Sequence, residues 1–297
     1  MLSFEPADKT VPEVFALMLD AIAPRPIAFA STIDSNGKPN LSPFSFFNVF
    51  GANPPILIFS PSRKGKDNTT KDTFENVKVV PEVVINMVNY EMVQQMNLAS
   101  TEFPRGINEF EKAGFTQLKS DLVKPYRLKE SPVQIECKVI QVIETGTMAS
   151  AGNLVICEAV KFHYQENIFN EKGQVDPYKI DLVGRMGRDY YIRANGNAIF
   201  TVEKPGKADC IGIDGLPESI KRSKVLSGND LGILGGLNRI PEMDEIIAFV
   251  TSSIYWDQLV NLKNDPNAFM YKKHMLAKEL LEQNKKVEAL QILLFEV

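Results

Sequence analysis

The amino-acid sequence predicts a mainly β domain with helices appended at its C-terminal end. Apolar and polar residues alternate from Val133 to Val139, which is the pattern of a half-buried strand. The dipeptide Asn36-Gly37 separates two further strand-like runs and is a strong hairpin signal. After residue 204, short strand signals give way to helical ones. We therefore expect a β domain over residues 1–204 and a helical extension over residues 205–297.

Turn residues and prolines divide the chain into its elements. Pro12 suits the first turn of a short helix, and Asn53-Pro54-Pro55 interrupts the chain before an apolar strand. Asp72 and Asn108 each stand three residues before a glutamate, the spacing of a capping box, so a helix should begin at each. The strands expected are 27–33, one from 40 onward, 56–60, 82–88, 133–139 and 154–164, and the helices expected are 13–19, one from 72, 92–98, one from 108 that Gly114 ends, 242–250, 255–262, 268–283 and 285–293.

Composition and charge exclude several classes of function. The 297 residues carry a net charge of −4, whereas nucleic-acid binding needs a dense basic face, so we expect no nucleic-acid partner. No apolar run reaches the roughly 18 residues of a membrane span, and the acidic, proline-interrupted N-terminus is unlike a signal peptide. We expect a cytoplasmic protein that binds no membrane. Three scattered cysteines and two histidines predict no metal site, and Cys137 and Cys157 are expected to be buried thiols.

A basic, hydroxyl-rich loop predicts a phosphate site. It begins at Ser60 and leads to the helix expected near Asp72, whose N-terminal N–H groups favour a phosphate. The side chains that could hold a phosphate there are Ser60, Ser62, Arg63 and Lys71. Taken alone, the segment fits a solvated loop with Asp72 as a helix cap better, because such loops are common and a carboxylate repels phosphate.

The segment from Ser42 to Asn48 predicts a surface for a flat ligand. It mixes serine hydroxyls with three phenylalanines without clear alternation, and Pro43 favours the edge of a sheet. Taken alone, it fits an edge strand whose phenylalanines belong to the core. Together with the basic loop, it indicates a nucleotide-like cofactor with a ring at one end and a phosphate at the other.

Side chains for acid–base or nucleophilic catalysis are scarce. The sequence lacks the G-x-S-x-G, H-E-x-x-H and P-loop patterns. The glycine-rich run from Gly184 to Arg188 leads to Tyr190 and Tyr191 rather than to the helix of a dinucleotide motif. His163 lies in an apolar strand and is expected to be structural. Chemistry that resides in a bound cofactor would need no such groups.

A series of motifs in order resembles the flavin reductase-like, FMN-binding split-barrel family, and within it the flavoredoxin-type branch. The motifs are A-P-R-P-I-A-F-A-S-T at 23–32, N-G-K-P-N-L-S-P-F-S-F-F-N at 36–48, N-P-P at 53–55, S-P-S-R-K at 60–64, K-D-T-F-E-N at 71–76, Glu102 to Pro104, Ser131 to Cys137, and Val183 to Tyr190. The resemblance runs from about residue 10 to residue 200 and leaves out the helical extension.

The resemblance implies a six-stranded antiparallel split barrel that forms a homodimer and holds FMN near the subunit interface. Tyr190 and Arg193 would close the site, and Arg25, which stands between two prolines, lies near the cofactor or is structural. The residues that would contact the isoalloxazine ring and ribityl chain are Ser31, Thr32, Ser45, Phe46, Phe47 and Asn48. Those that would hold the phosphate are Ser60, Ser62, Arg63, Lys71 and Thr73.

The function implied by the resemblance is that of an oxidoreductase. Electrons would pass from NADH or NADPH through FMN to a free flavin or another acceptor. Two alternatives stay open at this point. One is an FMN-carrying electron-transfer protein without NAD(P)H activity of its own, and the other is an interaction module whose helical tail docks partners.

Overall fold

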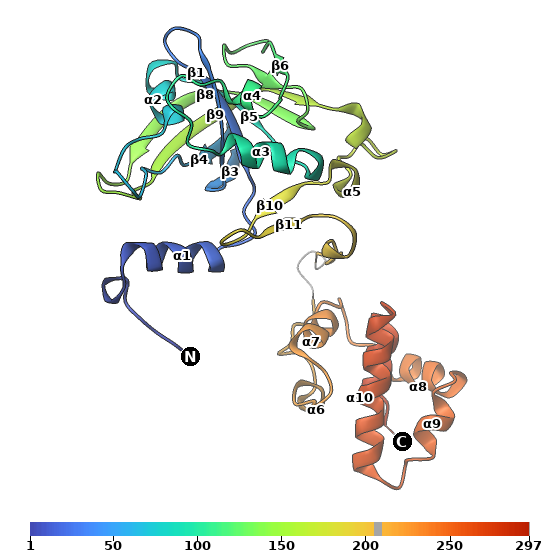
Figure 1. The fold of residues 1–297 in the computed structure, drawn as a ribbon. Helices are drawn as coiled ribbons and strands as arrows, with labels where there is room; N and C mark the ends of the chain where they lie inside the picture. Colours follow the sequence, from blue (N-terminus) through green and yellow to red (C-terminus); the bar gives the residue numbers. More distant parts are fainter. Residues whose placement is uncertain (205–209, 297) are drawn as a thin grey trace. The chain divides into compact units, whose positions relative to one another are not determined.

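The computed structural model describes residues 1–204 and 210–296. The chain divides into two compact units, Met1–Phe200 and Thr201–Val297 (Figure 1). The first unit is built on a β-sheet, and the second is helical. We expected the boundary between the two domains after Lys204. The next residues, 205–209, which include Pro205 and Gly206, lie outside the described part of the chain.

The elements of the first unit follow the expected runs where those runs are long. Its strands are β1 (Ala28–Ile33), β2 (Pro39–Phe44), β3 (Phe47–Ala52), β4 (Pro55–Phe59), β5 (Glu82–Asn86), β6 (Gln117–Leu118), β7 (Arg127–Leu128), β8 (Val133–Glu144), β9 (Asn153–Tyr164), β10 (Val183–Arg185) and β11 (Tyr191–Arg193). Its α-helices are α1 (Val11–Ala21), α2 (Asp72–Val79), α3 (Val93–Ala99), α4 (Glu109–Lys112) and α5 (Pro177–Ile180), with 3-10 helices at Pro6–Asp8, Tyr90–Met92, Glu166–Ile168 and Gly196–Ala198. Four of the strands that we did not expect, β6, β7, β10 and β11, have only two or three residues, and such a run shows no period. The fifth, β3, lies within the run expected to form a single strand from residue 40 onward.

Local signals explain how several elements begin and end. Gly37 has a φ of +80° in the turn between β1 and β2, and Gly114, at +70°, follows α4. The side chain of Asn108 caps α4 by accepting the N–H of Phe110, as its spacing predicts. The prediction for Asp72 is wrong in one respect, because Lys71 occupies the N-cap and Asp72 is the first helical residue. A carboxylate in the first turn of a helix is still favourable toward the helix dipole.

The described residues of the first unit form a seven-stranded antiparallel sheet in the order β2-β1-β5-β8-β9-β4-β3. At its centre is the long hairpin β8–β9, in which Val133 pairs with Tyr164 and Glu144 pairs with Asn153. The register of this hairpin shifts twice, and such bulges bend a sheet and increase its twist. The count exceeds the six strands implied by the resemblance because β3 pairs with β4 instead of continuing β2.

A two-residue link closes this sheet. β2 and β3 are its opposite edges, yet only Ser45 and Phe46 separate them in the sequence. Three Cα steps cover at most about 11 Å, so the two edges must lie close together and the sheet must curl into a barrel. Two contacts show the closure. The ring centroids of Phe44 and Phe59 are 5.5 Å apart, and the carbonyl of Phe46 accepts the N–H of Ser60 at 2.9 Å.

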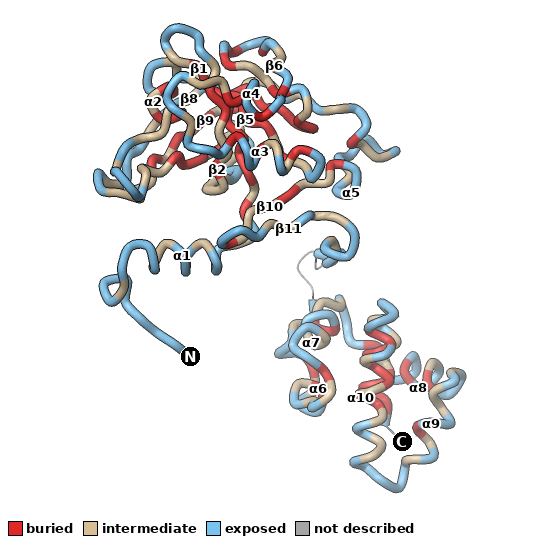
Figure 2. Tube along the Cα trace, in the orientation of Figure 1, coloured by how far each residue is buried: buried red, intermediate tan, exposed pale blue. Residues whose placement is uncertain are grey.

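The strands carry the core of the barrel, whereas α1 carries none of it. Cys137 and Cys157 are fully buried, as expected, and burial raises the pKa of both thiols, which keeps them protonated. Figure 2 shows buried residues concentrated in the central strands and a largely exposed α1. None of the residues of α1 is buried, although most of them are apolar.

The described residues of the helical unit form the four α-helices that the sequence predicts and two more. They are α6 (Glu218–Lys221), α7 (Gly228–Gly235), α8 (Met243–Ser252), α9 (Trp256–Val260), α10 (Pro266–Glu282) and α11 (Lys286–Leu294). Three glycines hide α7 in the sequence, because glycine lowers helix propensity. Gly235 is required by packing, since a Cβ there would lie 2.9 Å from the backbone of Gly212. Among the described residues, none of the helices is both long and apolar enough to cross a membrane.

Two buried ionisable side chains on α10 hold the helical unit together. The Nζ of Lys273 donates to the carbonyls of Leu293 (3.0 Å) and Phe295 (2.7 Å), which ties α10 to the C-terminal end of α11. The Nδ1 of His274 lies 2.7 Å from the hydroxyl of Ser223, and its buried Nε2 has no hydrogen-bond partner among the described residues. Burial and the adjacent Lys273 charge lower the pKa of His274, so the folded unit holds a neutral imidazole.

We predict that the helical unit loses stability as the pH falls below about 6.5. The unfolded chain takes up a proton at the ordinary histidine pKa, whereas folded His274 resists protonation, so acid favours unfolding. Trp256 is the single tryptophan of the chain and contacts Phe295 in the helical core, so its fluorescence reports this unit. We expect the thermal midpoint of that signal to fall between about pH 7.5 and pH 5.5, and His274→Gln to flatten this dependence.

The other histidine supplies the control. His163 lies in β9 of the barrel, so His163→Gln should leave the pH dependence of the Trp256 signal as it is in the unchanged protein. Equal pH dependence in His274→Gln and the unchanged protein would contradict the assignment to His274.

Candidate active site

A cavity of the first unit, the main cavity, lies where the sheet closes. It has a volume of about 720 Å³ and is bounded by α1, the Ser45–Phe46 link, the loop after β4 and the segment after β10. Such a volume is within the roughly 300–1,000 Å³ range of small-molecule and cofactor sites. The lining residues are Val11, Pro12, Phe15, Leu19, Arg25, Pro43, Phe44, Ser45, Phe46, Ser60, Ser62, Arg63, Lys64, Gly65, Lys71, Glu102, Met148, Ala149, Ser150, Arg185, Met186 and Arg188.

Hydrogen bonds fix the basic loop at one side of this cavity. The hydroxyl of Ser60 accepts the N–H of Asn153 at 3.1 Å, and the N–H of Arg63 donates to the carbonyl of Ala151 at 2.9 Å. The guanidinium of Arg63 donates to the side-chain and main-chain oxygens of Asn68, both at 2.8 Å. Asn68 sits at a φ of +59°, a conformation that asparagine tolerates. The orientation of Arg63 is therefore set before any ligand binds.

Arg25 fastens α1 over the cavity. Its NH1 donates to the carbonyls of Leu19 (2.7 Å) and Ile22, which are at the C-terminal end of α1. Its NH2 donates to the carbonyl of Met186 at 2.8 Å, and its Nε reaches the hydroxyl of Ser45 at 3.5 Å. A cation at the C-terminal end of a helix also complements the helix dipole. Arg25 thus lines the cavity and is structural at the same time.

Two glycines, Gly184 in β10 and Gly187 after it, let the chain come close to the end of α1 and to the segment that follows α1. A Cβ on Gly187 would lie 1.8 Å from the Oδ1 of Asp20, and one on Gly184 would lie 3.1 Å from the Cβ of Pro24. Main-chain bonds of 2.9 Å and 2.8 Å join Arg25 and Arg185 as an antiparallel bridge. The glycine-rich run that did not fit a dinucleotide motif therefore builds a wall of this cavity.

The cavity is strongly electropositive in an acidic protein. Its lining includes a single acidic side chain, Glu102, among the described residues, although the net charge of the chain is −4. Apolar side chains face the same space, and the rings of Phe15 and Phe46 meet edge to face at 6.0 Å. An apolar wall beside a dense positive charge suits a flat ring that carries an anionic group. The basic lining residues are Arg25, Arg63, Lys64, Lys71, Arg185 and Arg188.

The structure brings half of the expected site residues to this cavity. Those that line it are Ser45, Phe46, Ser60, Ser62, Arg63 and Lys71. Those that the structure places outside the lining are Ser31, Thr32, Phe47, Asn48, Thr73 and Tyr190.

Two of the outlying residues belong to a buried polar network. The amide of Asn40 donates to the hydroxyls of Thr73 (2.9 Å) and Thr32 (3.4 Å), and the amide of Asn76 donates to Thr32 at 3.1 Å. These bonds join α2 to β1 and β2. Ser31 is also buried in β1, and its hydroxyl has no partner among the described residues. The network sets the position of α2, and Lys71 stands at the beginning of that helix.

The remaining outlying residues lie at the surface or against the core. Phe47 packs on the barrel core, and Asn48 is exposed on the edge strand β3. Tyr190 is 69% exposed in the turn between β10 and β11. Arg193 forms two bonds with Asp181, at 2.8 Å and 2.7 Å, so its charge is already paired outside the cavity.

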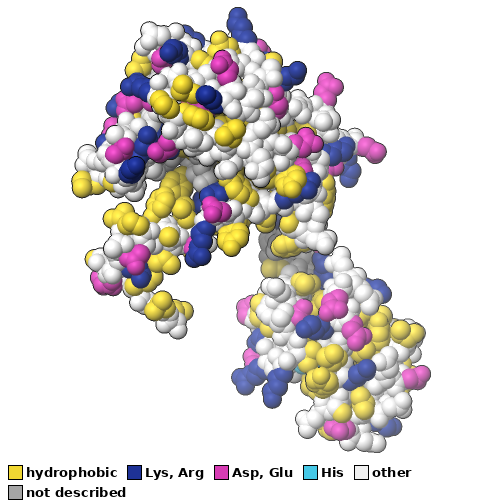
Figure 3. All heavy atoms as spheres, viewed as in Figure 1, with side chains coloured by type: hydrophobic (Ala, Val, Ile, Leu, Met, Phe, Trp, Pro, Cys, Tyr) yellow, Lys and Arg dark blue, Asp and Glu magenta, His cyan; other side chains and the backbone are white. Residues whose placement is uncertain are grey.

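Sequence reasoning missed α1, Lys64, Arg185 and Arg188 as parts of the site. A sequence signal was present for α1, because eight of its eleven residues are apolar, and the structure shows that none of them is buried. Figure 3 shows hydrophobic side chains gathered along this helix. The two arginines flank Gly187 in the glycine-rich run, and only the contact of that run with α1 reveals their place.

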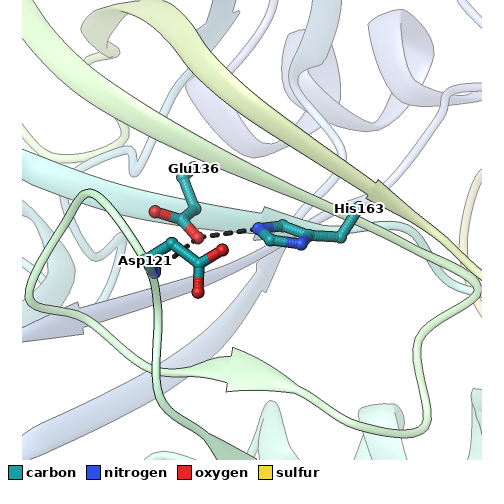
Figure 4. A group of neighbouring side chains, drawn as sticks. All are labelled: Asp121, Glu136 and His163. Carbon is teal, nitrogen blue, oxygen red and sulfur yellow. Dashed lines mark hydrogen bonds and ion pairs between the residues drawn. The ribbon is translucent and has the colours of Figure 1, made fainter.

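Asp121, Glu136 and His163 form a second cluster away from this cavity (Figure 4). Glu136 is fully buried, and its carboxylate accepts the N–H groups of Asp121 (2.9 Å), Leu122 (2.6 Å) and Val123 (3.2 Å), besides lying 2.7 Å from the Nε2 of His163. Burial raises the pKa of the Glu136 carboxyl, but these hydrogen bonds outweigh burial and the net shift is downward. Both carboxylate oxygens of Glu136 face N–H donors, whose partial positive charge would repel a cation. The hydrogen bonds instead clamp the loop that carries Asp121 onto β8.

Comparisons with known proteins agree with this architecture. The family model of the flavin reductase like domain matches residues 21–179. An uncharacterized protein of Aquifex aeolicus (strain VF5) is 40% identical over 183 residues, which are 62% of this chain and 91% of that protein. Neither alignment extends over the whole chain.

Solved structures show the same fold. Nitrilotriacetate monooxygenase component B from Bacillus cereus is 28% identical with a TM-score of 0.64, and the match covers 68% of this chain and 98% of that one. A putative flavin reductase with split barrel domain from Shewanella frigidimarina NCIMB 400 is 22% identical with a TM-score of 0.58, covering 69% and 100%. Flavoredoxin of Desulfovibrio vulgaris (Miyazaki F) is 19% identical with a TM-score of 0.51, covering 62% and 92%. The first unit is therefore a split barrel of the flavin reductase type.

We predict that Glu136→Ala destabilises the barrel by on the order of 3 kcal/mol, because it leaves buried N–H groups without an acceptor. Urea unfolding followed by far-ultraviolet circular dichroism measures this change. Glu158→Ala is the matched control, since Glu158 lies on the neighbouring strand, is only partly buried and makes no ion pair among the described residues. A loss of similar size in both variants would contradict the clamp.

We also predict that Arg25→Met releases α1. The variant removes the charged donors that hold the carbonyls of Leu19, Ile22 and Met186, so chymotrypsin should cut α1 at least about tenfold faster. Mass spectrometry of the fragments gives the site and rate. Arg188→Met is the control, because the bond from Arg188 to Asp20 is 3.5 Å long and exposed, and its cleavage rate should stay within about twofold of the original.

Proposed function

Because the chain belongs to the flavin reductase-like family, we propose that it is an FMN-binding oxidoreductase that passes electrons from NADH or NADPH through FMN to a free flavin or another acceptor. The observation that supports this most is the main cavity, in which six basic side chains and an aromatic wall share one space. FMN has the matching parts, a flat ring system and a phosphate.

The chemistry of the lining fits this cofactor. The hydroxyl of Ser62 and the cations of Arg63 and Lys71 would hold the phosphate, as the resemblance implies. Ser45 and Phe46 would meet the ring from the link that closes the barrel. Because Asn68 and Asn153 already fix this loop, little ordering is needed on binding, which favours affinity.

The reaction would reside in the cofactor and not in the side chains. The described lining contains no histidine, cysteine or tyrosine, which are among the side chains that most often transfer protons or act as nucleophiles in enzymes. FMN, when bound, supplies the capacity to take a hydride from a reduced nicotinamide and to pass electrons on. The chain would bind and orient the two ligands, and α1 would exclude water from between them.

We also propose that the active form is a homodimer. The edge strand β3 exposes Val49 and Phe50, each 63% accessible, and α1 exposes Leu17 and Met18. Adjacent exposed apolar side chains on an edge strand favour pairing with another chain. Sedimentation equilibrium would show a single-chain mass if this proposal is wrong.

The experiment that tests the function is a titration of the purified protein with FMN, followed by reduction under anaerobic conditions. We expect binding that quenches FMN fluorescence, with affinity about tenfold weaker in Arg63→Ala and in Lys71→Ala, because each removes a charge from the phosphate. Lys66→Ala is the matched control, since Lys66 is exposed in the same loop and outside the lining, and its affinity should change less than about twofold.

The anaerobic reduction distinguishes a reductase from an FMN-carrying electron-transfer protein. Bleaching of bound FMN by NADH or NADPH alone supports the reductase, and the faster of the two identifies the donor. Bleaching only by a partner protein would replace the reductase with an FMN-carrying electron-transfer protein. Failure of the unchanged protein to bind FMN would overturn both.

A further inference from the structure

A second, smaller hollow adjoins the main cavity. It has a volume of about 160 Å³ and shares Pro43, Ser45 and Arg185 with the main cavity. This volume is below the roughly 300 Å³ of a complete small-molecule site, so it suits one substituent of a ligand that lies mainly in the larger space. The residues that complete its lining are Ile27, Met96, Asn97, Ser100 and Tyr191.

Arg185 stands at the junction of the two hollows with its charge unpaired. It is half-buried, and its guanidinium lies over the ring of Tyr191 at 4.5 Å from the centroid. Among the described residues, no carboxylate forms an ion pair with it and no acceptor bonds its side chain. Stacking uses the faces of the guanidinium and leaves the N–H groups at its edge available. The Tyr191 ring therefore orients donors that have no acceptor.

Arg25 adds a second positive charge at the same place. Burial, followed by repulsion from Arg185, lowers the pKa of Arg25, whereas Asp20 acts in the opposite sense. The donors of Arg25 are taken up by main-chain carbonyls and by the Ser45 hydroxyl, which satisfy its hydrogen bonds but do not neutralise its charge. Two guanidinium groups near each other, with one set of free donors, favour an anion.

We propose that the junction formed by Arg25, Ser45 and Arg185 is a second anion site, which binds an oxyanion of the molecule that exchanges electrons with the cofactor. The inference rests on the proposed function and names the ligand chemistry of the same cavity. Arg185 is the ligand residue, and Arg25 contributes a fixed charge. The oxyanion is either a phosphate of the nicotinamide dinucleotide or the carboxylate of an aromatic acceptor.

This site is distinct from the phosphate-binding loop. The loop residues Ser62, Arg63 and Lys71 follow β4, whereas Arg185 ends β10 and touches the smaller hollow, which none of those loop residues lines. Removing Arg185 should therefore weaken the second ligand while FMN still binds.

The test measures binding to the FMN-loaded protein by calorimetry, with NADP⁺, NAD⁺ and benzoate as separate probes. We expect Arg185→Met to weaken at least one probe by about tenfold or more, and Arg185→Lys to restore part of that affinity, because lysine keeps the charge and loses the planar donors. The affinity for FMN, followed by fluorescence quenching, should change less than about twofold. Arg222→Met is the control for loss of a surface arginine in the helical unit, where Arg222 is 83% exposed.

The probes distinguish the source of the oxyanion. Weakening of NADP⁺ or NAD⁺ supports a dinucleotide phosphate, and weakening of benzoate supports an acceptor carboxylate. In turnover, either result should appear as a raised KM with kcat little changed. Circular dichroism verifies that both Arg185 variants are folded.

Other results overturn the inference. Unchanged affinity for all three probes in Arg185→Met, or no binding of any probe to the unchanged protein, removes the second site. A parallel loss of FMN affinity would assign Arg185 to the cofactor itself, while the proposed function stands. Only failure of the unchanged protein to bind FMN would overturn the proposed function, and this inference with it.

Discussion

The closure of the sheet by Ser45 and Phe46 is the constraint from which the rest of the first unit follows. Because the two edge strands β2 and β3 are joined by two residues, the seven strands cannot remain an open sheet. The same link bonds the chain after β4 through Phe46 and Ser60 and faces the cavity. The same two residues, Ser45 and Phe46, therefore close the barrel and form part of the candidate site.

The cavity that results concentrates positive charge in a protein whose net charge is negative. The basic side chains of the lining come from four separate segments of the chain. Main-chain hydrogen bonds, such as those between Arg25 and Arg185, hold these segments side by side. Arg25 has a double role in this arrangement. It holds the end of α1 and adds charge to the wall, so the cover of the cavity and its electrostatics depend on the same guanidinium.

The helical unit is stabilised in a different way from the barrel. Its core forms around α10, whose side chains Lys273 and His274 are buried. Main-chain carbonyls accept hydrogen bonds from Lys273, and the Ser223 hydroxyl is the hydrogen-bond partner of His274. The family match ends at residue 179, before this unit begins. The function proposed here therefore rests on the barrel alone.

The sequence by itself determined the elements whose signals lie within a few neighbouring residues. The Asn36-Gly37 turn, the alternation in β8, the caps around α4 and the helices α8 to α11 follow from such local patterns, and the motif order sufficed to predict a split barrel. Six of the twelve expected site residues line the cavity because they belong to the link and to the basic loop. Only the tertiary structure decided the rest. Thr32 and Thr73 enter a buried network, and Arg185 joins Arg25 from 160 residues away, because sheet closure brings together segments whose sequences carry no sign of each other.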